Sequence, residues 1–319
     1  MLQRAALTLA AAITLAQPAA GEPLAVRDQN PLIRGAYLPL PAPAAAAEGG
    51  WAYAASLEWS NTLNLETTAR EQLLIDEETA ELDLSAARSV GPWRLRAMLP
   101  VITRGGGVLD GFIDAWHGWF GLPRGDRPLR ARNLYAIEYS RAGGPALNAP
   151  AGSALGDLAL EGGRRLAGGE RGELVAWLGL EAPTGSRTRL TGDGVLDLAG
   201  WLDGRARLGP RWELTARAGL TLAGRGTSLP GERPVRFGSL ALDLRLTPAL
   251  AAIVQLDGHS AVVRGSELHF LGRAIALTVG GRYRLESGSV FEAGVVEDLE
   301  VDHLPDVALH FGWRWPVVR

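Results

Sequence analysis

The segment Val108–Leu122 holds the residues whose types and spacing best suit ligand chemistry. Asp110, Asp114 and His117 stand at i, i+4 and i+7, so a helix would place two carboxylates and an imidazole on one face. Apolar side chains, Trp116 among them, would occupy the other face. The polar face could touch a solute. One His and two Asp on an exposed helix are normally solvated, so we expect no metal here.

Charged residues of both signs alternate with apolar residues in many stretches of the chain. If those stretches enclose an interior, opposite charges can pair with one another across a lumen of low dielectric constant. A ring of a single sign would instead indicate an ion-selective pore. Mixed signs predict a narrow, salt-bridged interior, and they fit structural filling at least as well. The charges predicted to face this lumen include Arg94, Arg96, Glu181, Asp203, Arg205, Arg245 and Arg282.

Hydrolytic chemistry needs a nucleophile within hydrogen-bond reach of a histidine, and no stretch supplies this pair. His259 and Ser260 are adjacent, and neighbouring strand residues face opposite sides. Glu267 and His269 could share a face, but Ser266 would point away from them. We therefore predict no catalytic residues and no enzyme activity, with a lipid-acting outer-membrane enzyme as an alternative that stays open.

The stretch 306–315 shows which elements position these residues. Side chains alternate between the two faces of a strand, so one face here is large and apolar while the other is polar or small. The apolar face consists of Val307, Leu309, Phe311, Trp313 and Trp315. A strand of a transmembrane β-barrel has this pattern, with lipid outside, a wet lumen inside and aromatic residues at the membrane interface.

The same period of two recurs along the chain and predicts twelve strands. They lie at 51–60, 81–86, 93–101, 156–166, 174–180, 196–208, 212–222, 240–246, 250–256, 275–285, 291–295 and 306–315. Tight turns rich in Gly, Pro or Ser are expected at 88–92, 166–171, 209–211, 247–249 and 286–289. Longer polar links are expected at 62–77, 105–152, 183–194, 224–234 and 260–273. Short turns on one side and long loops on the other are typical of outer-membrane barrels.

Composition limits the other classes of protein. An apolar run after Arg4, with small residues up to Gly21, predicts a cleaved secretory signal peptide at 1–21. The absence of cysteine excludes a disulfide framework and a lipoprotein anchor. A net charge of −3 gives no sign of nucleic-acid binding. No motif calls for a cofactor.

These observations predict an all-β fold: an up-and-down antiparallel transmembrane barrel at 51–319, with the long loop at 105–152 carrying the amphipathic helix. The Pro- and Ala-rich segment 22–50 is predicted to be periplasmic, either tucked into the barrel mouth or acting only as a tether. The helix is either a lid or constriction of the barrel or an interfacial helix in the outer leaflet. A soluble, secreted β-sandwich of the same length is the alternative architecture.

The chain resembles an uncharacterised outer-membrane family that is known only as a domain of unknown function. The matching stretches are 26–32 (Val-Arg-Asp-Gln-Asn-Pro-Leu), 112–123 with Arg124 and Arg127, 297–299 and 305–307. Asp28 stands where this family would have Asn. The stretch Gly156-Asp157-Leu158, with Pro183-Thr184-Gly185, is also similar to barrels that admit aromatic or fatty compounds. The first resemblance implies location and fold, and it leaves the activity open.

We therefore predict a monomeric barrel in the outer membrane of a Gram-negative bacterium. It would be a channel or binding site for a small, partly hydrophobic solute, with Asp110, Asp114, Trp116, His117 and Arg127 as ligand or gate residues. Its expected partners are outer-membrane lipid, that solute and the barrel assembly machinery, which would bind the C-terminal strand. The alternative is a structural or surface-interaction barrel that transports nothing.

Overall fold

A computed structural model describes residues 21–34, 36–41, 49–121, 127–144, 146–224, 229, 231, 234–300, 303–305 and 307–317. The signal peptide was predicted at 1–21, almost wholly outside this part of the chain, and Leu122, Pro123, Arg124 and Asp306 also lie outside it. No helix among the described residues is long and apolar enough to cross a membrane.

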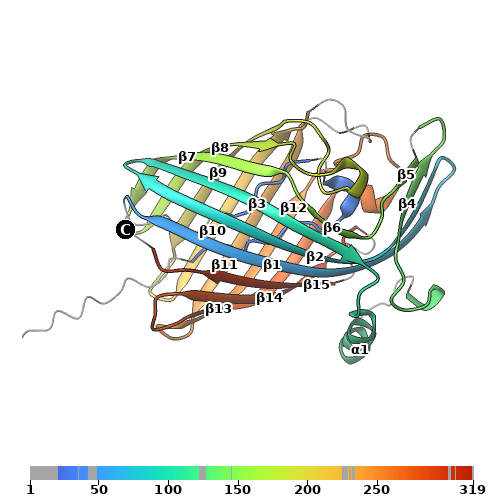
Figure 1. The fold of residues 1–319 in the computed structure, drawn as a ribbon. Helices are drawn as coiled ribbons and strands as arrows, with labels where there is room; N and C mark the ends of the chain where they lie inside the picture. Colours follow the sequence, from blue (N-terminus) through green and yellow to red (C-terminus); the bar gives the residue numbers. More distant parts are fainter. Residues whose placement is uncertain are drawn as a thin grey trace, which may run out of the picture.

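Twelve antiparallel strands form a closed barrel, because the last strand pairs with the first (Figure 1). They are β1 (Trp51–Thr67), β2 (Glu71–Val90), β3 (Trp93–Gly105), β7 (Leu158–Gly169), β8 (Gly172–Ala182), β9 (Asp197–Arg207), β10 (Trp212–Leu222), β11 (Val235–Arg245), β12 (Leu250–His259), β13 (Ala274–Arg284), β14 (Val290–Asp298) and β15 (Val307–Arg314). Trp59 pairs with Leu309 at the closing seam. The predicted fold class is confirmed, and the sandwich alternative is wrong.

Three short strands extend the sheet beyond the barrel at one end: β4 (Ala136–Arg141), β5 (Ala146–Asn148) and β6 (Gly152–Leu155). The predicted loop at 62–77 is wrong, because β1 and β2 stay paired as far as Thr67 and Gln72. Leu73 and Ile75 in this extension are buried. The pattern was missed because polar residues lie on both faces where the hairpin leaves the membrane region.

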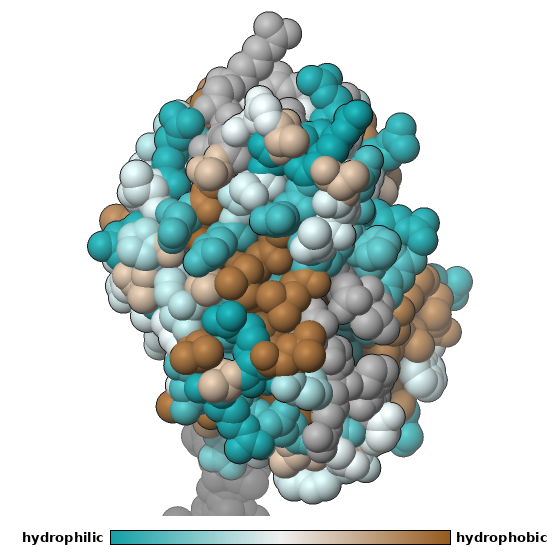
Figure 2. All heavy atoms as spheres, turned by 90° about the vertical axis from the view of Figure 1, so that its right-hand side faces the viewer, coloured by the Kyte–Doolittle hydropathy of each residue, from teal (hydrophilic) through white to brown (hydrophobic). Residues whose placement is uncertain are grey.

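The two ends of the barrel differ as predicted. Tight turns of a few residues connect the strands at the end where the C-terminus lies, and the long connections gather at the opposite end (Figure 1). The long-loop end carries α1 (Asp110–Phe120) and three short 3-10 helices: η2 (Arg127–Leu129), η3 (Arg187–Arg189) and η4 (His269–Leu271). Figure 2 views this end, where a mostly hydrophilic surface has hydrophobic residues gathered near the centre of the view.

The outer face of the barrel is apolar where it would meet lipid. Leu178, for example, is 74% exposed, which an aqueous surface would rarely repeat on strand after strand. Large aromatic side chains stand near the short-turn ends of the strands, as an interfacial girdle requires. These are Trp51, Tyr53, Trp93, Trp212, Tyr283, Phe291 and Trp315.

A hydrophobic cluster lies beneath the long loops, and we call it the loop-end core. It combines residues of β2, β4 and the loop before β13 with the 3-10 helix η1 (Pro31–Ile33) of the N-terminal segment. Its largest buried members include Ile75, Ile137, Tyr139, Phe270 and Leu271. The long-loop end of the lumen is thus covered by packed side chains.

Candidate functional site in the lumen

The N-terminal segment lies inside the barrel, where Figure 1 shows it in blue. We call residues 21–34 and 36–41 the leader hairpin. Its first leg starts near the short turns, where Arg282 donates to the carbonyl of Glu22. It reaches the loop-end core at Asn30, which donates to the carbonyl of Phe270. The second leg then returns, and Arg96 donates to the carbonyl of Pro41 over 2.8 Å.

Wall side chains satisfy the main chain of the leader hairpin. Gln255 accepts from the N–H of Leu24 over 2.7 Å and donates back to its carbonyl over 3.1 Å. The main-chain N–H of Tyr37 donates to Asp197 over 3.0 Å. Buried main-chain groups need partners, and here the wall supplies them in place of a neighbouring strand.

Glu81 of β2 binds the first leg and the turn of the leader hairpin. This side chain is 0% exposed and forms ion pairs with Arg27 of the first leg, at 3.7 Å, and with Arg34 near the turn. Arg27 also reaches Asp83 at 3.1 Å. A buried carboxylate is tolerated only when it is paired, so both guanidiniums are part of the lumen structure.

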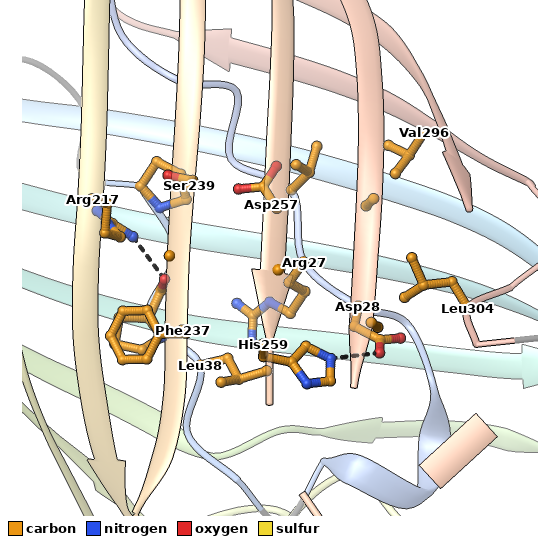
Figure 3. A pocket seen from close by; sticks show the side chains of 17 residues that line it. Arg27, Asp28, Leu38, Arg217, Phe237, Ser239, Asp257, His259, Val296 and Leu304 are labelled. Atoms are coloured by element: carbon orange, nitrogen blue, oxygen red, sulfur yellow. Dashed lines mark hydrogen bonds and ion pairs between the residues drawn. The ribbon is translucent and has the colours of Figure 1, made fainter. Parts of the chain in front are cut away.

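Two further contacts fix the orientation of the hairpin. The hydroxyl of Tyr37 donates to Glu161 over 2.6 Å, and Arg96 pairs with the same carboxylate. Asp28 lies 3.0 Å from Nε2 of His259 on β12 (Figure 3). Glycines in the wall make room for this packing. A Cβ at Gly179 would come within 2.7 Å of the Tyr37 hydroxyl oxygen.

A partly open cavity lies between the leader hairpin and strands β10 to β14 (Figure 3). Most of its lining is apolar: Val26, Leu38, Phe237, Ala274, Ala276, Val296 and Leu304. Asp257, Ser239 and the Asp28–His259 pair add polar groups at separate points. An apolar enclosure with a few polar groups is the usual form of a small-molecule site.

Most of the predicted lumen charges take defined partners. Arg96 and Arg282 bind the leader hairpin and wall carboxylates, and Asp203 pairs with Arg217 at 2.7 Å. Arg94 pairs with Glu173, which Arg205 also approaches at 3.9 Å. Glu181 lies opposite Asp197 near the long loops, and Arg245 donates to the carbonyl of Pro210 at a short turn.

The predicted ligand or gate residues lie outside the barrel wall. Helix α1 packs through Leu109 and Ile113 against Val307, on the outer face of β1, β14 and β15 (Figure 1). Trp116 donates to Glu297 on that same outer face, over 3.0 Å. His117 is buried in the helix contact. A solute that meets this helix would approach along the wall and not along the barrel axis.

The remaining candidates on α1 form hydrogen bonds that hold the helix in place. Asp110 accepts from the side chains of Asn61 and Arg127 and from the N–H of Asn133, over 2.8, 3.1 and 2.6 Å. Burial alone would raise the pKa of Asp110, but these three donors outweigh it and lower the pKa. Asp114 is bound by exposed Arg132.

The residues weighed for hydrolysis take separate partners. Nδ1 of His259 lies 2.9 Å from the carbonyl oxygen of Ser260, while its Nε2 meets the leader hairpin. Ser266 donates to Glu71, and His269 lies 3.7 Å from Glu66. The side chain of His269 is 69% exposed.

The two short motifs at 156–158 and 183–185 contact each other at the long-loop rim. Asp157 accepts from the N–H of Gly185 over 2.6 Å, and Thr184 donates to the carbonyl of Gly156 over 2.8 Å. Burial raises the pKa of Asp157 despite its main-chain donors. A Cβ at Gly192 would come within 2.4 Å of the Asp157 carboxylate, so glycine is required there. These hydrogen bonds hold the two motifs together beside the lumen.

The inward contacts of the leader hairpin and of Gln255 were not predicted from the sequence. The hairpin has no periodicity, and its partners lie far along the chain, 231 residues in the case of Leu24 and Gln255. One signal was present in the sequence: the inward acids of β2, Glu77, Glu81 and Asp83, outnumber nearby wall cations and call for basic partners such as Arg27.

Comparisons place these features among known proteins. A family model described as "Protein of unknown function (DUF3187)" matches residues 2–316. No curated protein matches the chain. The chain is similar to the COG4313 outer membrane channel from Pseudomonas putida F1, with 12% identity and a TM-score of 0.57 over 88% of this chain and 97% of that chain. The P. putida toluene transporter TodX has 10% identity and a TM-score of 0.42 over 86% and 91%. The fold is therefore that of outer-membrane barrels.

Proposed function

The chain belongs to this family of proteins of unknown function, and from its fold and lumen we propose an outer-membrane channel for a small, partly hydrophobic solute. The observation that carries the proposal is the mainly apolar cavity beside the leader hairpin. The solute occupies this cavity and moves past the hairpin, which must shift to let it through.

The chemistry of the cavity supports this choice of solute. Phe237 of the wall and Leu38 of the leader hairpin present apolar surface to the cavity, which favours an aromatic or aliphatic body. Asp257 and Ser239 supply an acceptor and a hydroxyl for one polar group on that body. A strongly anionic solute would lose hydration among the apolar residues without gaining a matched ion pair, because Arg27 and Arg217 in the lining already pair with wall carboxylates.

The dense contacts of the leader hairpin favour a second candidate, a structural or surface-interaction barrel that transports nothing. Arg96 alone makes two hydrogen bonds to leader carbonyls and an ion pair to the wall. In that case the hairpin braces the wall permanently. Solute uptake separates the two candidates.

The channel proposal is tested by filling the cavity with a larger side chain. Ala276 lines it from β13, so Ala276→Trp should abolish saturable binding and uptake of a small aromatic fluorophore by liposomes that hold the full-length protein. Ala218→Trp is the matched control, because Ala218 is exposed on the outer face of β10. Gel mobility before and after boiling checks that each variant folds. Equal uptake by both variants would show that the solute does not pass through this cavity. If the unaltered protein neither binds nor takes up the fluorophore, the structural candidate is favoured.

A further inference from the structure

The lumen wall contacts the leader hairpin as a receptor contacts an extended peptide. Six carbonyls of the hairpin accept from wall side chains, and none of these bonds depends on which leader side chain is present. The donors are Arg282 to Glu22, Gln255 to Leu24, Thr221 to Tyr37, Arg217 to Pro39, and Arg96 to Leu40 and Pro41. Main-chain hydrogen bonds of this kind supply affinity in peptide recognition.

The barrel does not need the hairpin to complete its hydrogen-bonded sheet. The ladder closes between β1 and β15, and the leader residues belong to no strand. The hairpin is therefore held by side chains in the lumen, as a ligand is, and its removal would leave every strand of the barrel paired.

Two features add selectivity to these main-chain contacts. Glu81 pairs with Arg27 and Arg34, which lie seven residues apart on either side of η1. Glu161 accepts from the hydroxyl of Tyr37, a third fixed point. The site thus suits a basic segment that folds back as a hairpin.

We propose that the lumen is a binding site for an arginine-containing oligopeptide that folds back as a hairpin, that the leader hairpin is its resident occupant, and that such a peptide from solution can replace it. This ligand class goes beyond the small solute proposed above. The leader hairpin takes part in both proposals, but their tests change different wall residues, Ala276 for the solute and Glu81 and Gln255 for the peptide, so either can fail while the other holds.

The experiment converts the resident hairpin into an exchangeable ligand in the folded protein. A protease site is placed within residues 42–48, between the hairpin and β1, and the full chain is cleaved after folding in detergent. A fluorescent synthetic peptide of residues 21–41 is then added, and its binding is followed by anisotropy. The natural chain has no cysteine, so one cysteine on the peptide takes the label alone.

Saturable binding is expected, with competition by the unlabelled peptide. A peptide that keeps the buried apolar residues, Asn30, the prolines, the tyrosine and both arginines, with alanine elsewhere, should bind within about tenfold of the natural one. A scrambled peptide of the same composition should compete at least about 100-fold more weakly, because it loses the register of the arginines and of Tyr37.

Substitutions in the wall separate the contribution of main-chain hydrogen bonds to peptide binding from the contribution of ion pairs. Glu81→Gln should weaken binding about 100-fold or more, because it removes the buried partner of two guanidiniums. Gln255→Met should weaken it about tenfold through the loss of two hydrogen bonds to Leu24. Glu78→Gln should have no effect, because Glu78 lies on the outer face of the same strand.

Three results would overturn the proposal. The first is no exchange in the cleaved protein and also none in its Glu81→Gln and Gln255→Met forms, where release is made easier. The second is equal competition by the scrambled peptide, which means unspecific attraction of positive charge. The third is binding of the natural sequence alone, which makes the hairpin a fixed part of the wall and not the occupant of a peptide site.

Discussion

The leader hairpin and helix α1 lie on opposite sides of the same strand, and each is held by one glutamate of β2. Glu81 faces the lumen and pairs with two arginines of the hairpin. Glu78 faces outward and accepts from the N–H groups of Val108 and Leu109, each over 2.6 Å. Glu78 and Glu81 are three positions apart in β2. Side chains alternate with a period of two along a strand, so an odd separation places the two side chains on opposite faces.

The charges of the two glutamates are stabilised in different ways. Glu81 is fully enclosed, so its charge is tolerated only through full ion pairs. Glu78 also receives a hydrogen bond from the indole N–H of Trp59, over 2.7 Å, and it lies where the positive end of a helix begins. The inner contact thus depends on opposite charges, while the outer contact depends on directed N–H donors.

The largest effect is expected from Glu81→Gln. The change leaves Arg27 with Asp83 alone and leaves Arg34 without its buried partner, at a cost of about 3–5 kcal/mol. Because the barrel ladder does not include the hairpin, release of the leader should precede unfolding of the barrel. Limited proteolysis within residues 21–41 measures this release. Unchanged protection of the leader in a folded variant would contradict the role given to Glu81.

Glu78→Gln should have a smaller effect, confined to the outside. Glutamine keeps one acceptor oxygen but turns an amide N–H₂ toward donors, which should cost about 1–3 kcal/mol. Proteolysis near α1 should increase, and the leader should stay protected. The comparison of inner and outer anchors would fail if this variant exposed the leader as readily as Glu81→Gln does.

The period-two pattern was enough to predict most of the wall. The predicted strand at 212–222 matches β10, and 275–285 differs by one residue from β13. This works because a membrane strand must be apolar on one face along its whole length. The helix predicted at 108–122 is observed at Asp110–Phe120, and it ends at Gly121, which has a left-handed conformation.

The placement of both attached segments could not be read from local patterns. An amphipathic helix suits a lumen or an outer wall equally well, and only the contact of Ile113 with Val307 decides the side. The leader hairpin has no periodicity because its main chain bonds to side chains such as Gln255 and Arg217 instead of to a neighbouring strand. Its position depends on partners that come together only in the closed barrel.

The smallest effect is expected from acid, and it should act on the outer segment. The pKa of Asp110 is lowered by its hydrogen bonds to Asn133, Asn61 and Arg127, which outweigh its burial. The stability that Asp110 contributes is therefore present above the ordinary aspartate range and is lost as the pH falls through its lowered value. As the pH falls below about 4, the contacts of helix α1 should weaken by a small amount. A change in the fluorescence of Trp116 and Trp119 measures this loosening.

Two variants sharpen this last prediction. Asp110→Asn cannot titrate, so it should remove the acid-dependent step and leave the helix loosened at neutral pH as well. Asp114→Asn should preserve the step, because the Asp114–Arg132 pair is largely exposed and such pairs contribute about 0–1 kcal/mol. An acid step that persists in Asp110→Asn would assign it to another carboxylate, and an acid step in leader protection at the same pH would show that the inner and outer segments are coupled through β2.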